Sequence, residues 1–160
     1  MTETSMTATP MTATSQTVTL ASLSEQTGLA VLDHLERSVS IPVVDGLQAQ
    51  GDLIVVPHSL LASAVRFWPT TSWKDVPAEG VELLRGEAGG NPHTLVGDPG
   101  TVRWTTGVSD SDGLAIGVFE ASAVAYLLHP EHGASGCAPG TYVVRRQRES
   151  EGGRGRLVAD

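Results

Sequence analysis

The sequence is short of thiols, aromatic side chains and long apolar runs, and each shortage excludes a class of protein. A single cysteine, Cys137, stands among 160 residues, so neither an intramolecular disulfide nor a metal site built from several thiolates can form. Aromatic residues make up 4% of the chain, which leaves Val, Leu, Ile and Ala to fill a core. No apolar run approaches the roughly 18–20 residues of a membrane-spanning helix.

Positive charge is also scarce. The 10 Lys and Arg residues against 18 Asp and Glu give a net charge of −8. Non-specific binding to nucleic acid or to anionic membranes needs a cationic field, so neither is expected as a partner. The N-terminus lacks a basic segment followed by an apolar stretch, so it does not predict a secretion signal. We therefore expect a soluble, cytoplasmic protein.

The composition changes along the chain and predicts four segments. Residues 1–20 repeat the pattern MTETS, MTATP, MTATS without an apolar period, which is typical of a disordered tail or of an arm that orders on a partner. We expect a helix within residues 21–40, a β-domain over residues 41–149 and a flexible tail over residues 150–160.

The helix is predicted over residues 22–39. Ser22, followed by Glu25 three residues later, fits a capping box at its start. Gly28 lowers the helix propensity by roughly 1 kcal/mol relative to Ala. One apolar stripe at helical spacing would pack on the β-domain or bind a protein partner, including a second copy of the chain; it consists of Leu29, Leu32, Leu35 and Val39.

From about residue 50 the pattern favours short strands separated by Gly, Pro and Asp. Residues 93–96 and 101–105 are predicted to pair as a hairpin, and residues 59–67 fit either a helical turn or a strand. The runs 114–119 and 123–128 are apolar on both faces, which is typical of central strands. Further strands are predicted at 52–56, 81–84 and 141–148.

This spacing predicts a mainly β fold. We expect a small antiparallel β-barrel or sandwich with one N-terminal amphipathic helix and disordered tails.

The residue types that metal chemistry needs gather in one place. A β-turn over His129-Pro130-Glu131-His132 would bring its two end residues within about 7 Å of each other. His93 shares a strand face with Leu95 and could point to the same mouth of a barrel. A cupin-like site for a divalent metal (zinc, iron, nickel or manganese) would then consist of His93, His129, His132 and Glu131. The alternative is a plain polar turn whose histidines cap a strand end.

Two further candidates have structural alternatives. A basic stretch of the last strand could bind an anion or protect a sheet edge by its charge; it consists of Arg145, Arg146 and Arg148. Cys137 has no cationic neighbour in the sequence, which is unfavourable for a nucleophile.

Several short motifs follow one another over about 100 residues. They are Gln50-Gly51-Asp52, Gly90-Asn91-Pro92-His93, His129-Pro130-Glu131-His132, Pro139-Gly140-Thr141-Tyr142 and Arg146-Gln147-Arg148-Glu149. With them the chain resembles a group of small uncharacterised bacterial β-rich proteins. The resemblance implies one coherent domain, and a histidine in other members where this chain has Asn91. It carries no activity to transfer.

Two hypotheses about function follow. The first is a small binding or assembly protein, an adaptor whose β-domain is a scaffold and whose helix contacts a partner or other copies. The alternative is a cupin-like metal-dependent enzyme or sensor that uses His93, His129 and His132. Whether the protein is an enzyme stays open at this point.

Overall fold

The computed structural model describes residues 17–31, 35, 40–84, 91–151 and 154–157, and most of them lie in strands. One sheet has five strands, in the order β1 (Val43–Val44), β12 (Gly133–Cys137), β11 (Ala125–His129), β7 (His93–Val96) and β6 (Val81–Leu84). The other has six, in the order β2 (Gln48–Gln50), β3 (Leu53–Pro57), β13 (Gly140–Arg146), β10 (Ala115–Ala121), β8 (Val102–Thr105) and β5 (Lys74–Asp75). Neighbouring strands are antiparallel except β1 and β12.

The two sheets enclose one apolar core. Leu95 and Leu127 of the five-stranded sheet belong to the same buried cluster as Phe119, Tyr142 and Val144 of the six-stranded sheet. Neither sheet closes on itself among the described strands, so the arrangement is sandwich-like and the barrel alternative is not observed. The mainly β fold with one α-helix is confirmed.

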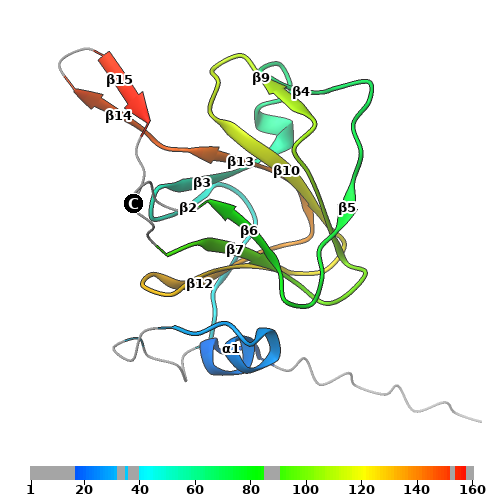
Figure 1. Ribbon diagram of the computed structural model, residues 1–160, viewed down its shortest axis with the longest axis vertical. Coiled ribbons are helices and arrows are strands. Elements are labelled where there is room, and N and C mark those ends of the chain that lie inside the picture. Colours follow the sequence, from blue (N-terminus) through cyan, green and yellow to red (C-terminus); the bar gives the residue numbers. More distant parts are fainter. Residues whose placement is uncertain (1–16, 32–34, 36–39, 85–90, 152–153, 158–160) are drawn as a thin grey trace, which may run out of the picture.

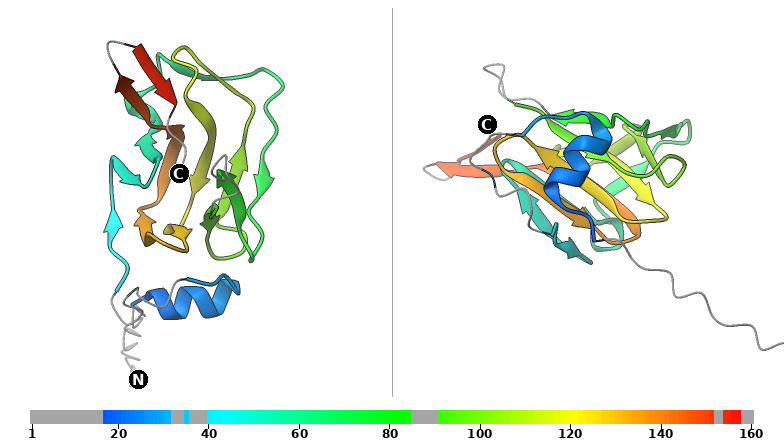
Figure 2. Two further views of the ribbon diagram at one scale, coloured as in Figure 1. Left: turned by 60° about the vertical axis from the view of Figure 1, so that its left-hand side comes forward. Right: turned by 90° about the horizontal axis from the view of Figure 1, so that it is seen from below.

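Each sheet is covered on its outer face. The helix α1 (Leu20–Thr27) lies across the five-stranded sheet, where Leu20 and Leu23 pack in one cluster with Val96 and Leu128 (Figure 1). The views in Figure 2 show the same placement from two further sides. On the six-stranded sheet, a second cluster around Val65 is covered by the short 3-10 helix η1 (His58–Leu60) and the paired strands β4 (Val65–Phe67) and β9 (Val108–Asp110).

The helix is shorter than predicted and begins earlier. Thr19, not Ser22, is the N-cap, and the two side chains form a capping box because each accepts a hydrogen bond from the other residue's backbone N–H. Gly28 ends the helix in a left-handed conformation (φ 73°) that favours glycine. The predicted helix over 22–39 therefore stops at Thr27; residues 32–34 and 36–39 lie outside the described residues.

One other expectation about elements differs from the structure. The predicted hairpin of 93–96 with 101–105 is wrong, because β7 and β8 belong to different sheets and the turn between them crosses from one sheet to the other. Among the described residues of the predicted flexible tail at 150–160, β14 (Arg148–Glu151) pairs with β15 (Arg154–Leu157), and the flexibility itself stays a prediction.

Of the predicted disordered tail, residues 1–16 lie outside the described residues, and Leu20 already belongs to α1. The central position of the two most apolar strands is confirmed: β10 lies between β13 and β8, and β11 between β12 and β7. No helix in the described part of the chain is long and apolar enough to cross a membrane.

Candidate functional site: a buried histidine cluster

The predicted turn brings His129 and His132 together. β11 ends at His129, which is paired with Gly133 at the start of β12, and residues 130–132 form the turn between them. The Nδ1 atom of His129 accepts hydrogen bonds from the backbone N–H groups of Glu131 (3.1 Å) and His132 (3.2 Å). The side chain of His129 thus stabilises its own turn, and its ring centroid lies 4.3 Å from that of His132.

His93 joins them from the neighbouring strand. It begins β7, which pairs with β11, and like Leu95 two residues later it points inward. Its ring centroid lies 4.4 Å from that of His129 and 6.2 Å from that of His132. The three histidines proposed from the sequence therefore do lie together, with His93 and His129 each only 1% exposed and His132 exposed.

The other sheet contributes two polar partners that sequence reasoning did not assign to this site. The β2–β3 turn carries Gln50 and Asp52 on either side of Gly51, whose left-handed φ of 56° fits the first central position of a tight hairpin turn. Asp52 Oδ1 lies 2.8 Å from Nε2 of His93, and Gln50 Oε1 lies 3.1 Å from Nδ1. We call the set of Gln50, Asp52, His93, His129 and His132 the histidine cluster.

The hydrogen bonds determine where the protons are. Gln50 donates through Nε2 to the carbonyl oxygens of Leu127 (3.0 Å) and Gly133 (3.4 Å), so its Oε1 must face His93 as an acceptor. His93 Nδ1 is then a donor. His93 Nε2 lies 2.8 Å from the 2% exposed Asp52, and with a proton on this nitrogen the two form a buried ion pair.

In His129, unlike His93, the Nδ1 atom is an acceptor. Its Nδ1 accepts two backbone N–H groups, so in the neutral ring the proton sits on Nε2. That Nε2 is buried, and no described residue makes a hydrogen bond of ordinary geometry with it. Burial lowers the pKa of His129, and the neighbouring His93 and His132 lower it further, which favours the neutral ring.

This proton arrangement bears directly on metal binding, which needs an unprotonated nitrogen on each imidazole. His93 Nδ1 donates to Gln50 and its Nε2 is engaged by Asp52, while the only lone pair of His129 faces its own turn. In the described part of the chain, no group of three or more His, Cys, Asp or Glu side chains is placed to hold a metal ion. The fourth proposed ligand, Glu131, is exposed and accepts a hydrogen bond from Asn91 Nδ2 (2.9 Å).

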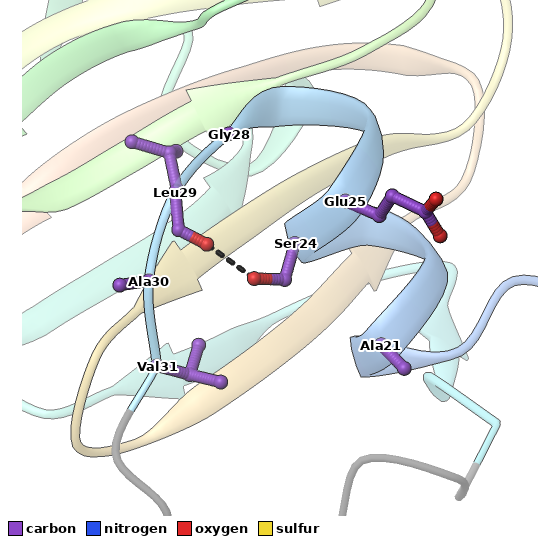
Figure 3. Close-up of a pocket in the computed structure, with 7 residues that line it drawn as sticks. All are labelled: Ala21, Ser24, Glu25, Gly28, Leu29, Ala30 and Val31. Atoms are coloured by element: carbon purple, nitrogen blue, oxygen red, sulfur yellow. Dashed lines mark hydrogen bonds between the residues drawn. The ribbon is translucent and has the colours of Figure 1, made fainter.

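Only two of the four residues in the apolar stripe proposed for partner binding lie in the described part of the chain. Leu29 and Leu35 are partly buried and pack against the cluster under α1, while Leu32 and Val39 lie outside the described residues. Figure 3 shows residues 28–31 running beside α1 along a groove, where the hydroxyl of Ser24 donates to the carbonyl oxygen of Leu29. Where the structure describes the stripe, it packs on this protein's own sheet.

The basic residues of β13 do not form one patch. Arg145 is bound to Asp110 (2.7 Å) and Asp112 (3.4 Å), and Asp110 in turn accepts backbone N–H groups of the turn before β10. Arg146 is its neighbour in the strand and so faces the other side of the sheet. The side chain of Arg148 lies outside the described part of the structure.

Cys137 is fully buried between the sheets. Burial raises the pKa of its thiol to about 12, so the nucleophilic thiolate is absent near neutral pH.

Sequence reasoning missed an exposed apolar surface beside η1. Phe67 contacts both the ring of His58 (centroids 5.1 Å apart) and that of Trp73 (5.6 Å). Trp68 follows β4, and its indole N–H donates to the hydroxyl of Ser109 (2.8 Å). Leu60 is 68%, Phe67 39% and Trp68 49% exposed. We use the name aromatic surface for the exposed residues of η1 and of the end of β4, which are Leu60, Phe67 and Trp68, together with His58 and Trp73, whose rings contact Phe67.

Fold and site together define a mainly β domain whose two sheets are joined at one end by a buried polar cluster. Residues 49–147 match the family described as a domain of unknown function (DUF8820), which is more than half of the chain, and the chain belongs to this family. The matched region contains all five residues of the histidine cluster. No curated protein and no solved structure matches the chain.

Proposed function

We propose that this protein is a small binding or assembly protein: its sandwich-like β-domain is a rigid scaffold that presents the aromatic surface to a protein partner or to another copy. The observation that carries the proposal is the pair Phe67 and Trp68, 39% and 49% exposed in a chain with only 4% aromatic residues. Leu60 of η1 is also exposed, at 68%.

The composition of this surface supports a contact role. Trp and Arg are enriched among the residues that contribute most to protein–protein affinity. Exposed apolar area costs roughly 25 cal/mol per Å² relative to burial, so a partner that covers two large rings gains affinity directly. The Trp68 indole is held by Ser109 and Phe67 by two neighbouring rings, so little side-chain freedom is lost on binding.

The metal-dependent alternative has less support. Its ligand set would have to include His93, whose two ring nitrogens are engaged by Gln50 and Asp52, and His129, whose Nδ1 lone pair faces its own turn. The same contacts join the β2–β3 turn of one sheet to β7 and β11 of the other, which is a structural role. A cytoplasmic location stays a prediction.

A photo-reactive amino acid tests the proposal inside the cells that make the protein. Trp68 is replaced by p-benzoylphenylalanine, which keeps an aromatic group at this position; the matched controls carry it at Leu47, which is 61% exposed, and at exposed His132. The proposal predicts one discrete cross-linked product from position 68 that is absent from both controls. No product at 68, or the same products at all three positions, would contradict it.

A further inference from the structure

We infer that His129 makes the β11–β12 turn acid-sensitive: when its ring takes up a second proton, the turn at residues 130–132 opens locally while the two sheets stay folded. This conformational device lies at the histidine cluster and is independent of the aromatic surface.

The first argument is the hydrogen bonding of the ring. In the closed turn, Nδ1 of His129 accepts the backbone N–H groups of Glu131 (3.1 Å) and His132 (3.2 Å), and the proton of the neutral ring is on Nε2. A protonated imidazole carries an N–H group on both nitrogens and has no acceptor left. The closed turn and the protonated ring therefore exclude each other, and uptake of the proton breaks both hydrogen bonds at once.

The second argument is the set of charged and titratable groups around the ring. Burial of His129 opposes its positive charge, and so do His93, which faces it from β7, and His132 in the turn. The backbone of Asn91 and the exposed Glu131 act in the opposite direction. Together these groups lower the pKa of His129 in the closed turn, so the closed turn favours the neutral ring.

Two further elements face the ring. Asp52, on the β2–β3 turn, lies 2.8 Å from Nε2 of His93 and is engaged there. On β12, the uncharged Gly133 is paired with His129. Among the described residues, no carboxylate makes a hydrogen bond with the ring of His129 that would hold a second proton in the closed turn.

The third argument is that the turn is weakly attached to the rest of the domain. Glu131 and His132 are exposed. Further hydrogen bonds to the turn come from Asn91 to Glu131 (2.9 Å) and from Gln50 to the carbonyl oxygen of Gly133 (3.4 Å), and none of these residues belongs to the apolar core between the sheets. A segment with few buried apolar contacts opens at a lower free-energy cost than the core strands do.

Opening of the turn also changes the surroundings of His93. Its ring is nearly parallel to that of the exposed His132, with 16° between the planes and 6.2 Å between the centroids. Movement of the turn takes this ring away from His93, which is only 1% exposed in the closed form, and admits water to the buried pair of His93 and Asp52. The open form therefore presents different polar groups at this end of the molecule.

The sign of the pH dependence follows from these contacts. In the open turn the ring of His129 is free of the two N–H donors and reaches water, so its pKa returns toward the ordinary value of about 6.5. As the pH falls, the open form takes up the proton first. The equilibrium constant for opening is therefore independent of pH above about 6.5 and rises below it, by at most about tenfold per pH unit.

Amide hydrogen exchange tests the inference, measured by NMR on the full-length protein between pH 7.5 and 5.0. The probes are the amides of Glu131 and His132, which donate to His129. Their protection factors should be constant down to about pH 6.5 and then fall by up to about tenfold per pH unit. Low urea concentrations should leave their exchange unchanged but accelerate that of fully buried Val118 in β10, because local opening exposes little surface and unfolding exposes much.

Two variants assign the effect to one ring. His129→Asn keeps an acceptor for both N–H groups but does not titrate, so the protection of its turn amides should not depend on pH. His132→Asn removes the neighbouring imidazole and keeps His129, so the fall in the protection of the Glu131 amide should remain.

Four results would overturn the inference. They are wild-type turn amides whose protection does not change with pH, the same fall in His129→Asn, absence of the fall in His132→Asn, and turn amides that respond to urea as Val118 does. The urea comparison needs only the wild type, so it separates local opening from unfolding even where a variant does not fold.

Discussion

At the scale of single residues, the sequence predicts that the three histidines of the cluster lie close together but does not predict their two polar partners. A turn at 129–132 and the alternation of β7 place His93, His129 and His132 near each other from local rules alone. Gln50 and Asp52 could not be assigned to them, because the contacts to His93 span 43 and 41 residues and depend on how two sheets face each other. Those two partners change the chemistry, since they occupy both ring nitrogens of His93.

The Asp52–His93 pair predicts a large loss of stability when either partner is removed. Asp52→Asn and His93→Gln should each lower the free energy of unfolding by roughly 3–5 kcal/mol, because removing one partner leaves the other buried group uncompensated. The double variant should lose less than the sum of the two single losses. Urea unfolding of the four proteins measures this coupling, and strictly additive losses would mean that the pair does not interact.

His129 predicts a pH dependence. The pKa of its folded-state ring is lowered, so the unfolded chain takes up the proton first. The contribution to stability is therefore complete above the ordinary His pKa of about 6.5 and is lost as pH falls from there toward the folded-state value. The free energy of unfolding should fall between pH 7.5 and 5.5, by at most about 1.4 kcal/mol per pH unit from this group.

The matched variant is His129→Asn, whose side-chain oxygen can accept the same two turn N–H groups without titrating. Urea unfolding at several pH values should show a flatter profile for His129→Asn than for the wild type. Parallel profiles would show that His129 is not the group responsible.

At the scale of elements, periodicity identified most strands because this chain fills its core with short apolar runs. It failed where pairing is decided by tertiary context: β7 and β8 have the sequence of a hairpin, yet each packs in a different sheet. Periodicity also predicts too long a helix. Leu29 and Leu35 continue the apolar pattern beyond Gly28, but that glycine ends the helix.

The docking of α1 predicts which of its side chains stabilise the domain. Leu23 is 2% exposed in the cluster with Val96 and Leu128, so Leu23→Ala should cost about 2–5 kcal/mol in the free energy of unfolding. Glu25→Ala, on the exposed side of the same helix, should change it by less than about 0.5 kcal/mol. Equal small effects of both substitutions in urea unfolding would show that α1 does not pack on the sheet in solution.

At the scale of the whole molecule, the polar cluster and the exposed aromatic surface lie in different places and have different roles. The cluster joins the two sheets, while η1 and the β4–β9 pair carry the aromatic surface on the outer side of the six-stranded sheet. Sequence patterns could not separate them: Val65 to Trp68 resembles a buried strand, and only the packed structure leaves Phe67 and Trp68 exposed.

The central claim is that the histidine cluster has a structural role and binds no metal, so that function belongs to the surface. It is tested most directly by the nitrogen-15 NMR signals of the imidazole rings, which report the proton on each nitrogen. At pH 7.5 we predict a proton on Nε2 but not Nδ1 of His129 and a proton on Nδ1 of His93, all unchanged by excess zinc. An unprotonated Nε2 of His129 whose signal shifts on zinc addition would contradict the claim and return the cluster to the role of a metal site.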